Sequence, residues 1–144
     1  MVILLLLTAC TSPRVATRNA RWSVAPLVYN LPDSPCPDYV VVAAADLWDL
    51  EVTYEKDRAY TINVGPATQH TSGQAIAETR RYEVALDDEP LPLVIGADVE
   101  LWRCDDPKII LHELGHALGW GHGPKGTIMA TYLEDIGYLF PEDK

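Results

Sequence analysis

The stretch HELGHALGWGH, from His112 to His122, constrains this chain more than any other part of its sequence. It holds three of the four histidines of the chain, with a glutamate directly after the first. Residues four apart lie on the same face of an α-helix, so His112 and His116 can present two imidazoles to one cation. Glu113 is offset by about 100° around the helix, which places it beside such a cation but not among its direct ligands.

The residues around this run predict the helix that the spacing requires. Asp106 is typical of an N-cap and Pro107 of a first helical residue, and Gly119 predicts a sharp C-terminal bend. After that bend, His122 can return as a third ligand. Three neutral imidazoles suit Zn²⁺ better than Mg²⁺ or Ca²⁺, and three protein ligands leave one position open for water, as in catalytic sites. We therefore expect one catalytic zinc ion, with Glu113 as general base.

The full run H-E-x-x-H-x-x-G-x-x-H resembles the signature of the metzincin metalloproteases and is most similar to their matrixin branch. Metzincins also carry a methionine turn after the third histidine, and GTIMATY, residues 126–132, places Met129 seven residues beyond His122. The resemblance implies a zinc-dependent metalloendopeptidase, in which a zinc-bound water activated by Glu113 hydrolyses a peptide bond. It also implies that Gly119 and Met129 support the metal site.

The resemblance further implies a substrate strand and a limit on metal content. The segment Gly73–Thr79 would be the edge strand along which a peptide or protein substrate lies, with Ala75, Ile76 and Ala77 at its centre. His70 is the only histidine outside the run and is expected in an exposed loop, so no second, structural zinc is predicted. Calcium binding stays open.

Three other functions would use the same residues. A gluzincin-type zinc peptidase would take Glu134, 18 residues after His116, as its third ligand. A non-catalytic zinc-binding surface lipoprotein would keep the histidines without turnover. A zinc hydrolase could also act on a substrate other than a peptide.

The N-terminal sequence predicts export. The apolar run Met1–Leu7 is too short to span a bilayer, which takes about 20 residues, but suits the hydrophobic part of a secretory signal, although no Lys or Arg precedes it. LTAC resembles the lipobox of bacterial lipoproteins, in which Cys10 would be lipidated. We expect a signal segment over 1–10, a tether over 11–20 and one catalytic domain over 21–144, in a secreted or lipid-anchored, extracytoplasmic envelope protein.

The net charge limits the partners that this domain can have, and the cysteines allow one disulfide. A net charge of −10 argues against nucleic acid and against direct binding to an anionic bilayer, which leaves a lipid anchor as the only membrane contact. Cys36 and Cys104 would either form a disulfide in an oxidising compartment or stay unpaired as small apolar residues. The oligomeric state stays open.

The order of elements predicts an α+β domain. The expected elements are a strand in Arg21–Leu31, a helix in Tyr39–Val52, strands in Ala59–Gly65, Gly73–Leu86 and Leu91–Arg103, the motif helix in Asp105–Gly119 and a helix in Tyr132–Phe140. The expected core-facing residues are Val40, Ala43, Ala44, Leu47 and Leu50 of the first helix, and Ala97, Val99 and Leu101 of the last strand. The resemblance implies a metzincin-like zincin fold, with a mixed twisted sheet, a long backing helix, a zinc-site helix and a C-terminal helix.

Overall fold

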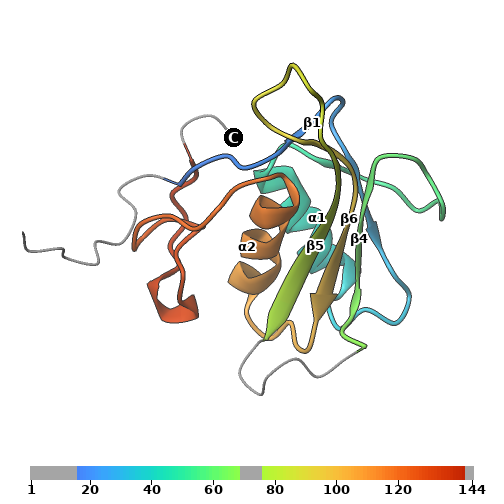
Figure 1. Cartoon of the computed structure of the whole chain (residues 1–144). Helices are drawn as coiled ribbons and strands as arrows, with labels where there is room; N and C mark the ends of the chain where they lie inside the picture. Colours follow the sequence, from blue (N-terminus) through green and yellow to red (C-terminus); the bar gives the residue numbers. More distant parts are fainter. Residues whose placement is uncertain (1–15, 69–75, 142–144) are drawn as a thin grey trace, which may run out of the picture.

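The computed structural model describes residues 16–68 and 76–141, which form one sheet packed against two helices (Figure 1). The coarse prediction of an α+β domain is therefore confirmed. The elements are β1 Arg21–Trp22, β2 Leu27–Asn30, α1 Asp38–Leu47, β3 Glu51–Val52, β4 Thr61–Pro66, β5 Ala77–Val84, β6 Leu93–Leu101, α2 Pro107–Ala117 and a 3₁₀ turn, η1, Leu133–Asp135.

The strand β6 organises the sheet. It pairs in parallel with β1 and β4 and antiparallel with β5, while β4 continues in parallel to β2 and β2 to β3. Ala97, Val99 and Leu101 of β6 are all buried, as predicted. The antiparallel β5 lies at an edge of the sheet, with Thr79 opposite Val99 and Arg81 opposite Ala97. Because side chains alternate along a strand, Thr79 and Arg81 share one face, the face that contacts α2.

The buried face of the first helix matches the prediction only in part: Ala44 and Leu50 are buried and Val40 is partly buried, as predicted, but the rest of the face differs. Val41, Ala44, Ala45 and the following Trp48 are buried, whereas Ala43 and Leu47 are exposed. The Trp48 indole N–H donates to the Leu111 carbonyl at 2.7 Å, which fixes the side of α1 that meets α2. The predicted face was wrong by about one residue, because a 3.6-residue period fits two neighbouring registers of this Ala- and Val-rich stretch.

The boundaries of two predicted elements also differ. The chain over Arg21–Leu31 forms two short strands instead of one, since Ser23–Pro26 interrupts the pairing. The first helix ends at Leu47, not Val52: Asp49 has φ of 59°, the Leu50 amide bonds back to the Ala45 carbonyl, and β3 follows.

The predicted C-terminal helix in Tyr132–Phe140 is wrong. Only the 3₁₀ turn η1 forms there. The segment pairs with the turn that carries Met129: the Gly137 amide donates to the Thr127 carbonyl, and the Ile128 amide donates to the Leu139 carbonyl. These long-range bonds satisfy the backbone groups that a helix would have paired internally.

Several predicted features lie outside the described residues. They are the signal segment 1–10, which includes Cys10, and two single residues of a later stretch, His70 and Ala75. The end of the predicted tether is described, and Ala16–Ala20 is packed against the domain, with Ala16 and Ala20 buried. No helix among the described residues is both long and apolar enough to cross a membrane.

Cys36 and Cys104 form a disulfide, with their Cα atoms 5.1 Å apart. Cys36 directly precedes the cap of α1, and Cys104 lies two residues before Asp106, the cap of α2. The crosslink therefore ties together the starts of the two helices.

Reduction of this disulfide should lower the free energy of unfolding by about 2–4 kcal/mol, because a bond between cysteines 68 residues apart restricts the unfolded chain. Urea unfolding with and without reductant measures the change. The double variant Cys36→Ala, Cys104→Ala is the matched control, and its midpoint should not respond to reductant. Equal midpoints for the oxidised and reduced wild-type protein would contradict the prediction.

Candidate metal centre

The helix α2 places the first two histidines of the motif. It begins as predicted: the Asp106 side chain accepts a hydrogen bond from the Lys108 amide at 3.0 Å, and Pro107 is the first helical residue. His112 and His116 lie one turn apart on α2, with ring centroids 4.5 Å apart. A buried helix of this kind holds both rings on a rigid element.

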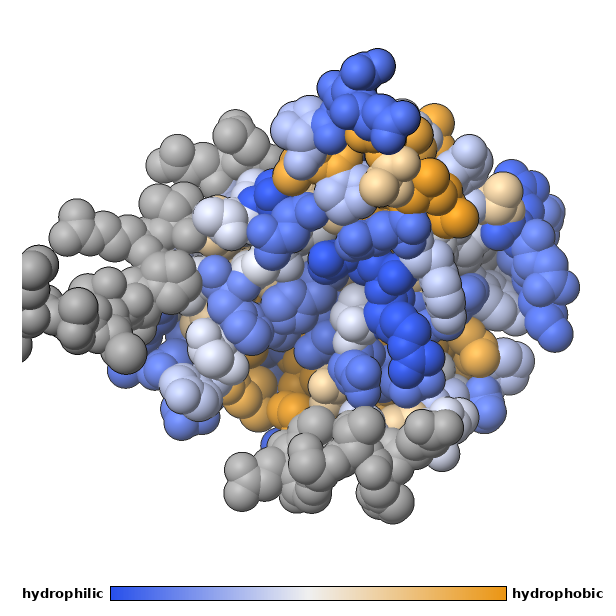
Figure 2. Space-filling model, in the orientation of Figure 1, coloured by the Kyte–Doolittle hydropathy of each residue, from blue (hydrophilic) through white to orange (hydrophobic). Residues whose placement is uncertain are grey.

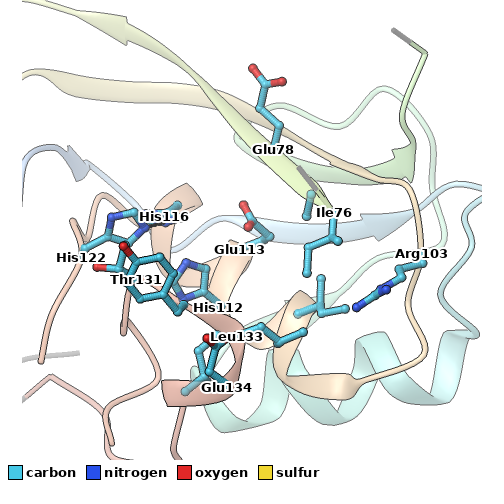
Figure 3. Close-up of a pocket in the computed structure, with 14 residues that line it drawn as sticks. Ile76, Glu78, Arg103, His112, Glu113, His116, His122, Thr131, Leu133 and Glu134 are labelled. Atoms are coloured by element: carbon cyan, nitrogen blue, oxygen red, sulfur yellow. Dashed lines mark hydrogen bonds between the residues drawn. The ribbon is translucent and has the colours of Figure 1, made fainter. Parts of the chain in front are cut away.

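The chain beyond α2 brings the third histidine to them. Gly119 has φ of +103°, a left-handed conformation that side chains resist, and a Cβ there would lie 2.1 Å from the Ala20 carbonyl oxygen. The ring of His122 then stacks on that of His112 at 5.5 Å, and its Nε2 lies 3.2 Å from Nε2 of His116. The predicted bend at Gly119 is present, and Figure 3 shows His122 returned to the side of His112 and His116.

One nitrogen from each ring lies within 4.8 Å of the others, and no further cluster of potential metal ligands is found in the described ranges 16–68 and 76–141. Nδ1 of His112 lies 2.7 Å from the Ile128 carbonyl oxygen, and Nδ1 of His116 lies 2.8 Å from that of Trp120. A carbonyl only accepts, so both Nδ1 atoms carry the proton and both Nε2 lone pairs face the cluster. Outer hydrogen bonds of this type orient histidines that ligate metals.

The electrostatics favour neutral rings. Burial lowers the pKa of all three histidines, and the nearby His116 contributes to the lowering for His112 and His122; the resulting pKa of His112 is about 4. Neutral imidazole is the form that ligates a metal. Three convergent imidazole nitrogens, with no carboxylate among them, could hold a metal ion, and such donors suit a transition metal better than Mg²⁺ or Ca²⁺.

Glu113 is buried beside the histidines, and the hydroxyl of Thr79 on β5 donates to its carboxylate at 2.5 Å. Burial raises the pKa of Glu113 to about 7; the Thr79 hydrogen bond opposes this shift and the charge of Glu78 adds to it. A carboxyl group that titrates near neutrality can both accept and release a proton. The contact of Thr79 with Glu113 was not predictable from the sequence pattern, because it depends on how β5 lies against α2.

Met129 is fully buried directly under the motif helix. A Cβ on Gly115 would lie 2.2 Å from the Met129 sulfur and 2.9 Å from the Trp48 ring, so only glycine fits between His112 and His116 at this point. Sequence reasoning singled out Met129 but missed Gly115. Gly115 could have been noticed in the sequence, because glycine is a poor helix former and this one stands in the middle of a confidently predicted helix.

A cavity of about 560 Å³ opens beside the three histidines. Ile76 and Ala77, from the predicted substrate strand, line it at the start of β5. Glu134 also lines it, but lies exposed on η1 and is not one of the clustered ligands. The arrangement thus joins a histidine cluster that could hold a metal ion, a buried carboxyl group and a space large enough for part of a substrate.

No protein-family model, no curated protein and no solved structure matches this chain. The motif and the geometry of the site therefore carry the evidence for function.

Proposed function

We propose that this chain is a zinc-dependent metalloendopeptidase with a metzincin-like zincin fold. The observation that carries the proposal is the convergence of three imidazole nitrogens within 4.8 Å of one another, with the rings of His112 and His116 held by Nδ1–H bonds to the carbonyls of Ile128 and Trp120. His112, His116 and His122 would hold one zinc ion. A second, structural zinc is not part of the proposal.

The chemistry divides between the metal and Glu113. Zinc held by His112, His116 and His122 would lower the pKa of a bound water toward neutrality and would polarise the scissile carbonyl. Glu113 accepts a proton from the attacking water and passes it to the leaving amine. Thr79 holds the Glu113 carboxylate through its hydroxyl. The pKa of about 7 suits a group that must take up and release a proton in one cycle.

The edge strand β5 supports a peptide as the substrate. An extended chain can pair with an exposed sheet edge through main-chain hydrogen bonds, and the start of β5 leads into the cavity beside Glu113. The face that carries β5 is largely hydrophilic (Figure 2), so main-chain pairing would contribute more there than broad apolar contact. The cavity would receive a side chain next to the scissile bond.

The disulfide supports the proposed extracytoplasmic location, because such bonds persist in oxidising compartments. The protein would be secreted or anchored by a lipid on Cys10. Neither nucleic acid nor direct bilayer binding is proposed, given the net charge of −10.

Zinc analysis combined with a cleavage assay tests the proposal. The purified full chain should contain one equivalent of zinc and cleave a quenched peptide library. A chelator should reduce cleavage to the rate in buffer alone, and added Zn²⁺ should restore it, because both the activated water and the carbonyl polarisation depend on the metal. Cleavage that persists at full rate after zinc removal would overturn the proposal. A zinc-loaded protein that cleaves no peptide would point to the non-catalytic alternative or to another substrate.

A further inference from the structure

The segment Ala16–Ala20, the N-terminal strap, lies alongside the loop that carries His122. Figure 1 shows it in blue, next to the orange chain that leaves α2. The Asn19 amide donates to the Gly119 carbonyl at 2.7 Å, and the Gly121 amide donates to the Thr17 carbonyl at 2.8 Å. These two bonds enclose an antiparallel bridge between Arg18 and Trp120.

Three glycines make room for the strap. Besides the approach of Gly119 to Ala20, a Cβ on Gly121 would lie 2.8 Å from the Asn19 side chain, and one on Gly123 would lie 3.0 Å from Cβ of Ala16. The glycines alternate in GWGHG, residues 119–123, and each faces the strap. The spacing follows from strand geometry, in which every second residue points to the same side.

Further contacts hold the strap in place. Ala20 is completely buried and Ala16 almost so. The guanidinium of Arg18 lies 5.3 Å from the centre of the buried Trp120 ring, within range of a cation–π interaction. The strap is thus part of the packed domain.

The position of the His122 ring depends on the backbone around it more than the positions of the other two histidine rings do. His112 and His116 are held by α2 and by carbonyls at Nδ1, whereas the His122 ring has no carbonyl partner among the described residues and its Nε2 lies 3.2 Å from Nε2 of His116. The loop that carries His122 is fixed on one side by the strap and at its end by the Gly123 amide, which donates to the Met129 carbonyl at 2.7 Å.

We propose that the N-terminal strap is a positioning segment that holds His122 in the geometry needed to bind zinc. This inference rests on the proposed function. Loss of the strap would leave the α2 ligands in place and release the third, so zinc would be held by two imidazoles instead of three.

The full-length variants Asn19→Pro and Asn19→Ala test this. Both remove the side chain, but only proline removes the N–H that bonds to Gly119. Proline also keeps the preceding Arg18 extended, as a strap requires. We expect Asn19→Pro to weaken zinc affinity by about 10–100-fold, the range for outer partners of metal ligands, and Asn19→Ala to leave it unchanged. Competition with a chromogenic chelator gives the affinities, with no need for catalytic activity.

A double-mutant cycle separates positioning from a general loss of stability. In a His122→Ala background, Asn19→Pro should have no further effect on zinc affinity, because the ligand it positions is already gone. An equal loss of affinity with and without His122 would overturn the proposal, as would a wild-type affinity in Asn19→Pro.

Amide hydrogen exchange gives a readout that does not involve zinc. The Gly121 amide should exchange faster in Asn19→Pro than in Asn19→Ala, since release of the strap exposes this N–H to solvent. Unchanged exchange at Gly121 would overturn the strap proposal even if zinc binds. If Gly121 exchanges faster in Asn19→Pro but the wild-type protein binds no zinc, the result would support the contact between strap and loop. It would overturn the proposed function instead.

Discussion

The variant Glu113→Gln should keep its zinc and lose peptide cleavage by about 10²–10⁴-fold, the usual contribution of a general acid–base group. Glutamine has nearly the same shape as glutamate, and its amide oxygen can still accept the Thr79 hydrogen bond. It cannot take a proton from the attacking water. The loss should therefore appear in kcat, with the fold and the metal content unchanged.

Zinc content, thermal stability and cleavage rate are measured together on this variant. Glu55→Gln is a matched control, since this exposed glutamate pairs with Arg58 away from the site and should show the wild-type rate. Stability in Glu113→Gln should hold or rise, because burial disfavours the charged carboxylate that the substitution removes. Equal cleavage rates for Glu113→Gln and wild type would remove Glu113 from the mechanism and end the metalloendopeptidase proposal.

His122→Ala should weaken zinc affinity by more than about 100-fold, exceeding the 10–100-fold effect typical of an outer partner, because it removes a direct ligand. Glu134→Ala should keep the wild-type affinity. This contrast follows from the geometry: the Nε2 atoms of His116 and His122 lie 3.2 Å apart, whereas Glu134 lies exposed on η1 outside the cluster.

Competition titration of the two variants measures the difference. His116→Ala provides the comparison for a ligand on α2 and should lose at least as much affinity as His122→Ala. Loss of zinc in Glu134→Ala, with retention in His122→Ala, would replace the metzincin-like proposal with the gluzincin alternative.

The motif helix was predictable almost to the residue. Each feature of α2 has a local cause. Asp106 caps the helix because its side chain accepts an amide hydrogen bond, and Pro107 begins it because its φ is fixed near the helical value. Gly119 bends the chain after it because glycine readily adopts a positive φ. The proximity of His112 and His116 also follows from helix geometry alone. The burial of Ala97 and Val99 in β6 was predictable for the same kind of reason, since strand alternation is a local property.

The elements that were mispredicted depend on distant partners. The buried face of α1 was fixed by the hydrogen bond from Trp48 to Leu111, 63 residues along the chain. The chain after Tyr132 met the backbone of Thr127 and Ile128 and did not form a helix. In both cases the local pattern allowed more than one conformation, and contacts beyond the reach of helical periodicity, between residues 10 to 63 positions apart, selected among them.

The spacing of the candidate ligands, the place of Glu113 next to them and the break at Gly119 all follow from the amino-acid sequence, because helical periodicity and backbone preferences act over a few residues. The bond from Thr79 to Glu113, the packing of Met129 on Gly115 and the position of Ala16–Ala20 against the loop of His122 depend on how the whole chain folds. Those contacts join residues 14 to more than 100 positions apart, and no local preference of the chain encodes which distant backbone will meet them.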